Sequence, residues 1–81
     1  MTREEVMKKL NEIFRNVFDD ETIVLTDETN ANDIEDWDSL EQINLIVNIE
    51  NEFGMMFDMS EVSDLANVGE MADLIMRKAE E

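Results

Sequence analysis

The sequence has no cysteine, no histidine and no tyrosine. Without cysteine the chain has no disulfide bonds and no thiolate ligands for a metal ion, which suits the cytosol. Histidine, cysteine and tyrosine also supply many of the nucleophiles and general bases of enzymes, so only carboxylates and a few lysines remain. These absences argue against an independent enzyme, and we expect a non-catalytic protein.

Long hydrophobic segments are missing as well. Residues 1–5 lack the apolar core of a signal peptide, and no apolar run approaches the length that crosses a membrane. We therefore expect a cytoplasmic protein without membrane insertion. Its 81 residues make one small domain, over 1–81, with a modest core but no deep catalytic cleft.

Basic residues are few: 6 Lys and Arg stand against 22 Asp and Glu, which gives a formal charge of −16. A surface this negative repels nucleic acid and anionic lipid and attracts basic surfaces on protein partners. Half of the basic residues lie close together near the N-terminus: Lys8, Lys9 and Arg15. We expect these three on a solvated helix face with local ion pairs.

The excess of negative charge also predicts a response to divalent cations. Self-repulsion destabilises the compact state, so we expect millimolar Mg²⁺ or Ca²⁺ to raise the melting temperature. The measurement is a thermal melt with and without the divalent salt, at matched ionic strength. An unchanged melting curve would contradict this prediction.

The spacing of apolar residues predicts an all-α protein. A helix is expected at roughly Arg3 to Phe18, after a capping box in Thr2–Glu5. A short helix follows Asp58, which caps it together with Glu61, and a last helix opens at Asn67–Glu70. With the central helix described next, these elements predict a small four-helix bundle: three longer helices, a short third helix, and a long loop between the first two.

The central helix is predicted over Ser39–Phe53, because Asp38 caps its start, Glu41 can reach back to that cap, and Gly54 ends it. At roughly 100° per residue it carries two apolar stripes: Leu45, Ile46, Ile49 and Phe53 on one side, and Leu40, Ile43 and Val47 on another. One stripe is enough to bury a helix in a small bundle. The second stripe is therefore either covered by the preceding loop or a docking face for a partner, flanked by Glu41 and Glu50.

No helical or strand periodicity marks residues 19–37, and so long a loop needs apolar anchors. We expect four: Ile23, Val24, Leu25 and Ile34. The loop is rich in Asp, Glu and Asn, but it does not match an EF-hand, since it lacks the glycine of the sharp turn and the closing glutamate. We predict no specific metal site, only loose cation binding; a divalent-cation sensor stays open as an alternative.

The sequence Asp38-Ser39-Leu40, with the apolar and acidic residues that follow through Phe53, resembles the acyl carrier protein family. The resemblance continues through Val68–Ile75 and covers nearly all 81 residues. In that family the serine of Asp-Ser-Leu carries covalent 4'-phosphopantetheine, whose thiol holds acyl groups as thioesters. The resemblance thus implies that Ser39 is the attachment site, with Asp38 and Leu40 beside it, in fatty-acid or specialised lipid or polyketide biosynthesis.

The resemblance also implies partners. A phosphopantetheinyl transferase would modify the serine, and acyl-loading, acyl-transfer or condensing enzymes with basic docking surfaces would bind the helix that follows it. On this sequence the docking residues would be Glu41, Ile43, Val47 and Glu50, together with Leu40. We expect the carrier itself to be a monomer.

Some positions depart from the family pattern. Asp36 and Trp37 stand where carriers of fatty-acid synthesis usually have a small pair, and Asn44 and Asn48 replace a common glutamate and a small apolar residue. This favours a specialised member over a housekeeping one, and Trp37 is expected to cap the core where the loop meets the helix. The cluster of methionines in the second half suits an interior that opens for an acyl chain. Two alternatives stay open: a carrier of aminoacyl or D-alanyl units, and an acidic adaptor that is never modified.

Overall fold

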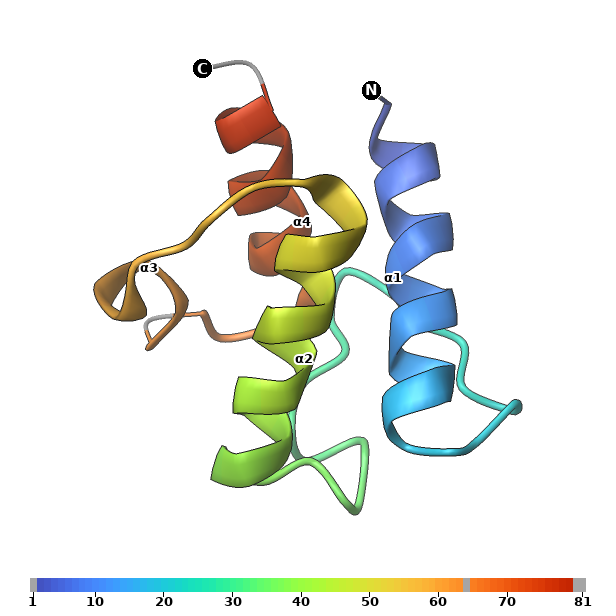
Figure 1. Cartoon of the computed structure of the whole chain (residues 1–81). Helices are drawn as coiled ribbons and strands as arrows, with labels where there is room; N and C mark the ends of the chain where they lie inside the picture. The colour runs from blue at the N-terminus through green and yellow to red at the C-terminus, as the bar shows by residue number, and fades with distance from the viewer. Residues whose placement is uncertain (1, 64, 80–81) are drawn as a thin grey trace.

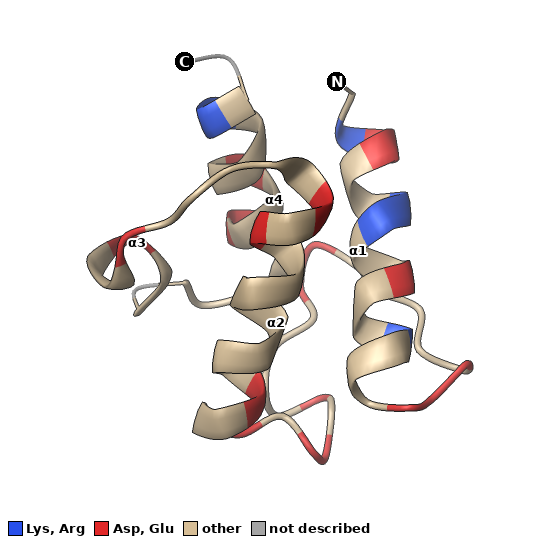
Figure 2. Cartoon of the chain, in the orientation of Figure 1, with Lys and Arg blue, Asp and Glu red and all other residues tan. Residues whose placement is uncertain are grey.

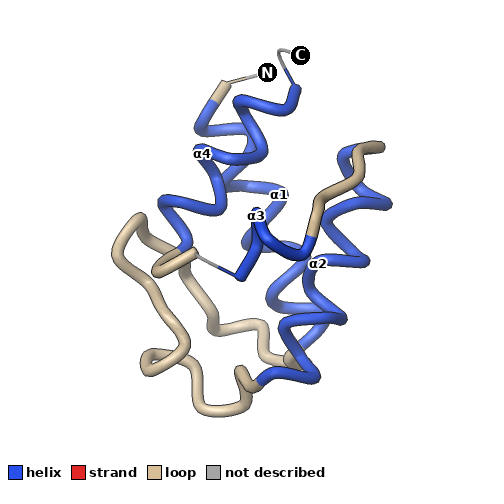
Figure 3. Tube along the Cα trace, turned by 90° about the vertical axis from the view of Figure 1, so that its left-hand side faces the viewer, coloured by secondary structure: helices blue, strands red, loops and turns tan. Residues whose placement is uncertain are grey.

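The computed structural model describes residues 2–63 and 65–79, and within them all regular structure is helical. The helices are α1 (Arg3–Val17), α2 (Ser39–Phe53), α3 (Met59–Ser63) and α4 (Val68–Ala79). α1, α2 and α4 form the bundle, while α3 is short and lies to one side of it (Figures 1 and 3). The predicted all-α fold is confirmed, and α1 ends one residue earlier than expected, with Phe18 as its C-cap.

The helix ends follow the capping signals in the sequence. The Thr2 Oγ1 accepts a hydrogen bond from the backbone N–H of Glu5 at 3.2 Å, and Asn67 Oδ1 accepts one from the N–H of Glu70 at 2.9 Å. Gly54 closes α2 in the left-handed conformation, at φ 64°, which glycine adopts without a steric cost. Local sequence therefore places these three helix ends.

The core lies where α1 packs against α2 and α4. Each helix contributes the apolar stripe that faces its neighbours, and the largest side chains without solvent contact are Phe14, Leu10, Leu45, Ile49, Ile75, Val6 and Val68. This core holds α2 against α1 by one stripe only. The other stripe of α2 is left for the surface.

The loop between α1 and α2 is fastened by hydrogen bonds as well as by apolar contacts. Asn11 Oδ1 accepts from the backbone N–H of Leu25 at 2.8 Å, and Arg15 Nε donates to the carbonyl of Ile23 at 2.8 Å. Leu25 is buried and Ile23 and Ile34 are partly buried, as expected. The expectation for Val24 is wrong, because this side chain is 73% exposed.

The far part of the loop joins the start of α4 through main-chain contacts. The N–H of Val68 donates to the carbonyl of Thr29 at 2.8 Å, and the N–H of Gly69 donates to the carbonyl of Asp27 at 2.9 Å. A Cβ on Gly69 would lie 2.8 Å from that Asp27 oxygen, so this approach requires glycine. Arg3 adds ion pairs to Asp27 and to Asp73 of α4.

Charge is distributed unevenly over the helices (Figure 2). α2 and α3 carry acidic residues and no Lys or Arg, whereas the basic residues belong to α1 and α4. Lys9 does not pair locally as expected: its Nζ lies 3.5 Å from Glu52 Oε1 on α2. The Arg15 side chain likewise binds the loop, through the carbonyl of Ile23, instead of lying on a solvated face with local ion pairs.

Candidate functional site

Ser39 is the first residue of α2, and its side chain is exposed. The preceding Asp38 caps the helix, since its Oδ1 accepts from the N–H of Glu41 at 2.9 Å. Within the part of the chain that the structure describes, the Ser39 hydroxyl has no hydrogen-bond partner that could activate it. An unactivated, accessible alcohol is suited to being modified by another enzyme rather than to catalysis. The free N–H groups of this helix end also favour a nearby anion.

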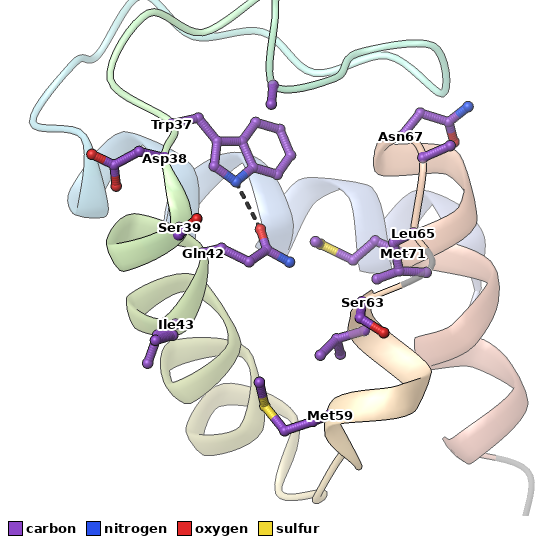
Figure 4. Close-up of a pocket in the computed structure, with 13 residues that line it drawn as sticks. Trp37, Asp38, Ser39, Gln42, Ile43, Met59, Ser63, Leu65, Asn67 and Met71 are labelled. Atoms are coloured by element: carbon purple, nitrogen blue, oxygen red, sulfur yellow. Dashed lines mark hydrogen bonds between the residues drawn. The ribbon is translucent and has the colours of Figure 1, made fainter.

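A pocket of about 530 Å³ lies beside Ser39. Figure 4 shows it between α2 on one side and α3 with α4 on the other. Most of its lining is apolar and comes from Ala31, Trp37, Ile43, Met59, Val62, Leu65, Ala66 and Met71. Met59 is 72% exposed and Met71 only 2%, so the lining runs from the surface into the core. The pocket thus offers an apolar space next to the exposed hydroxyl.

Trp37 forms one wall of this pocket and meets the core, as the sequence predicts. Its ring lies edge-on to Phe14, with centroids 5.1 Å apart and an interplanar angle of 84°, a favourable aromatic arrangement. Phe18 adds a tilted contact at 6.4 Å. The indole Nε1 donates to Gln42 Oε1 at 2.7 Å, which fixes Trp37 to the first turn of α2. The position of Ser39 is therefore tied to the core of α1.

The second apolar stripe of α2 is exposed. Leu40, Ile43 and Val47 expose 66%, 53% and 48% of their surfaces, so the loop does not cover them. This excludes the covering loop as the reason for the stripe. An apolar patch with acidic residues on the same helix has the composition of a site for a protein partner.

The two acidic residues expected at this face differ in their surroundings. Glu41 Oε1 lies 3.5 Å from the amide nitrogen of Asn44. Glu50 Oε2 accepts a hydrogen bond from the backbone N–H of Phe57 at 2.9 Å, and so it holds the linker that leads to α3. The sequence reasoning missed this internal role of Glu50, because nothing in the local pattern indicates it.

The position of α3 depends on two charged contacts. Glu61 Oε1 accepts from the N–H of Asp58 at 2.9 Å, which is the part of the expected cap that Glu61 supplies, and it pairs with Lys78 Nζ of α4 at 2.9 Å. The Asp58 N–H and, next, the Lys78 ammonium lower the pKa of Glu61. The carboxylate is therefore charged at neutral pH and keeps α3 beside α4, at the edge of the pocket.

The comparisons with known proteins agree with this geometry. A family model described as a phosphopantetheine attachment site matches residues 8–75. The chain belongs to the acyl carrier protein family. A holo acyl carrier protein from Geobacter metallireducens, solved by NMR, has 49% sequence identity over 93% of this chain and 86% of its own, with a TM-score of 0.87. No curated protein sequence matches the chain.

Because the chain belongs to this family, its cofactor is a covalently attached 4'-phosphopantetheine. The residues at the start of α2 fit such a group: the hydroxyl of Ser39 is exposed and uncommitted, and an apolar pocket lies beside it. Carrier domains of this type are generally non-catalytic. Nothing in the geometry of the described residues assigns this carrier a reaction of its own.

Among residues 2–63 and 65–79, no group of three or more acidic side chains is arranged to hold a metal ion. Among the same residues, no helix has both the length and the apolarity to span a bilayer.

Proposed function

We propose that Ser39 is the phosphopantetheine attachment residue of this carrier. The observation that carries the proposal is the exposed hydroxyl at the first position of α2, directly after the Asp38 cap and beside the pocket. A transferase would bind this helix end and take the hydroxyl proton. The Ser39 oxygen would then form a phosphodiester with the phosphate of coenzyme A that bears pantetheine, and adenosine 3',5'-bisphosphate would leave.

The attached arm supplies the thiol that this cysteine-free chain lacks, so that acyl groups can be held as thioesters. The residues of the chain itself hold the attachment site in position. Asp38 fixes the helix start that presents Ser39, and Leu40 is exposed directly after it. The phosphodiester would lie near the positive end of α2, although Asp38 reduces the electrostatic gain.

The proposed pathway is fatty-acid or specialised lipid or polyketide biosynthesis, with a specialised one favoured. The support is Trp37, which replaces a small residue and forms a wall of the pocket through its contacts with Phe14 and Gln42. A large ring at this wall changes the space available to the cargo. The proposed partners are a phosphopantetheinyl transferase and acyl-loading, acyl-transfer or condensing enzymes with basic docking surfaces.

The proposed function is tested by the intact mass of the protein after incubation with coenzyme A and a broad-specificity phosphopantetheinyl transferase. We expect the gain of one phosphopantetheine, located at Ser39 by fragmentation of the modified peptide. No gain by a folded sample would contradict the proposal and favour an adaptor that is never modified.

The docking face makes a separate prediction. Ile43→Ala is expected to lower kcat/KM of the modification about 5- to 30-fold, the range of a contact worth about 1–2 kcal/mol, because Ile43 lies at the centre of the exposed stripe. Glu41→Lys is expected to lower it further at low salt, since a basic partner surface would meet a positive charge. The rate is measured by mass spectrometry at several carrier concentrations.

Val24→Ala provides the control for this face, because Val24 is also exposed but belongs to the loop. Glu50→Lys is less informative on its own, as it also removes the acceptor of the Phe57 N–H. If Ile43→Ala and Glu50→Lys both leave modification and acyl loading unchanged, the assignment of the docking face is wrong.

A further inference from the structure

The pocket contains a side-chain amide whose orientation is fixed by its neighbour. Trp37 Nε1 is a donor only, so the atom of Gln42 that it meets at 2.7 Å must be the amide oxygen. The NH₂ group of Gln42 then lies on the other side of the amide. Figure 4 shows its nitrogen directed away from Trp37 and into the space between α2 and Met71.

This NH₂ group has no acceptor in the part of the chain that the structure describes. Every buried side-chain nitrogen and oxygen there has a hydrogen-bond partner, so the Gln42 nitrogen is instead reached from the open pocket. Water would occupy this donor when the pocket is empty. A ligand that displaces the water must supply an acceptor or leave the donor unpaired.

The other polar groups of the lining are engaged or face away from the pocket. Asp38 Oδ1 caps α2, and the Ser63 hydroxyl donates to the carbonyl of Ser60 at 3.4 Å. Asn67 Oδ1 caps α4, and Figure 4 shows the Asn67 nitrogen directed away from the pocket. Ser39 is the proposed attachment point. Gln42 is thus the lining residue whose uncommitted donor is directed into the pocket, within a surface that is otherwise mostly apolar.

We propose that Gln42 makes the pocket selective for acyl groups that carry an oxygen on the chain beyond the thioester, represented here by 3-oxoacyl chains, over saturated chains of equal length. The inference rests on the proposed function, because the cargo must be tethered at Ser39. The apolar lining accepts the hydrocarbon of the cargo, and the Gln42 NH₂ donates to the oxygen on it. A saturated chain in the same place removes water from this donor and has no oxygen beyond the thioester carbonyl, which both kinds of cargo share. Binding sites discriminate strongly when a buried donor is left unpaired.

The direct test is NMR of the Gln42 side-chain amide in three forms of the carrier: unacylated, hexanoyl and 3-oxohexanoyl. Each form is made by transfer from coenzyme A or the corresponding acyl-coenzyme A, and its mass is confirmed first. We expect the Gln42 side-chain proton signals to move downfield in the 3-oxohexanoyl form alone. Equal signals in the two acylated forms would overturn the inference. A shift already complete in the unacylated form would also overturn it, because an amide carbonyl of the arm would then be the acceptor.

Substitutions provide the second test. Gln42→Glu keeps an oxygen for Trp37 and removes the donor, and Asn51→Asp makes the same charge change at an exposed position of α2 outside the pocket. With the 3-oxohexanoyl cargo, Gln42→Glu should lower the protection of the thioester from exchange with an added thiol about two- to tenfold, the ratio expected for one net hydrogen bond. Asn51→Asp should leave it unchanged.

Gln42→Leu removes the hydrogen-bond donor without adding the negative charge that Gln42→Glu introduces. With an apolar side chain in place of the donor, hexanoyl should be protected as well as in the parent protein or better, while the protection of 3-oxohexanoyl falls. Each comparison uses one cargo, so the different reactivities of the two thioesters cancel. Equal losses for both cargoes would overturn the selectivity. Failure of the proposed function is distinguishable, because no acylated form would then be obtained.

Discussion

Ser39→Ala is expected to abolish the gain of phosphopantetheine while leaving the fold intact. The side chain is exposed at the first position of α2, and it makes no hydrogen bond to the described residues. Removing its hydroxyl therefore removes the attachment point but no contact of the core. The mass should stay that of the unmodified protein under conditions that convert the parent completely, and the thermal melt should match that of the parent within about 0.5 kcal/mol.

The sequence offers its own control for this experiment. It has three serines, and Ser63 lines the same pocket as Ser39. Ser63→Ala should be modified at the rate of the parent, since Ser63 lies in α3 and is not preceded by a helix-capping aspartate. Modification of Ser39→Ala would show that the arm attaches elsewhere, and loss of modification in Ser63→Ala would point to that residue.

Phe14→Ala is expected to cause the largest loss of stability, about 3–5 kcal/mol of the free energy of unfolding. Phe14 has no solvent exposure and contacts Phe18 and Trp37, with ring centroids 5.9 and 5.1 Å apart. Its removal leaves a cavity beneath the wall of the pocket. A small domain has only about 5–15 kcal/mol in total, so much of the population would unfold at moderate temperature.

Urea denaturation followed by the fluorescence of the single tryptophan measures this effect at the site itself. Phe18→Ala is the matched variant, because Phe18 belongs to the same aromatic cluster but is only partly buried. We expect a smaller loss for Phe18→Ala. Equal losses, or a loss below about 1 kcal/mol for Phe14→Ala, would contradict the view that Phe14 supports Trp37.

The helices and their order were predictable from the sequence because their signals are local. The caps Thr2, Asp38 and Asn67 and the terminator Gly54 act within a few residues of their own position. The exposed stripe of α2 was also predictable as a second face. Its role was not, because both a covering loop and a partner fit the same pattern, and the structure was needed to exclude the loop.

What the sequence did not reveal depends on contacts between distant segments. Arg15 and Asn11 bind the backbone of the loop, and Glu50 binds that of the linker; such side chains look like ordinary polar surface residues in a periodicity analysis. Val24 was misassigned for a related reason. Val24 is 73% exposed, although it stands between the partly buried Ile23 and the buried Leu25, and apolar character alone does not show which side chains of a loop face the core.

Two main-chain hydrogen bonds join the loop to α4, and they have a consequence for how this protein tolerates sequence change. Their acceptors are carbonyl groups of Asp27 and Thr29, which every amino acid possesses. These two hydrogen bonds therefore restrict the residue type at position 69 of the helix, whereas residue 27 of the loop contributes to them only through its main chain. Substitutions at positions 27 and 29 should therefore keep these two hydrogen bonds, provided that residue 69 remains glycine.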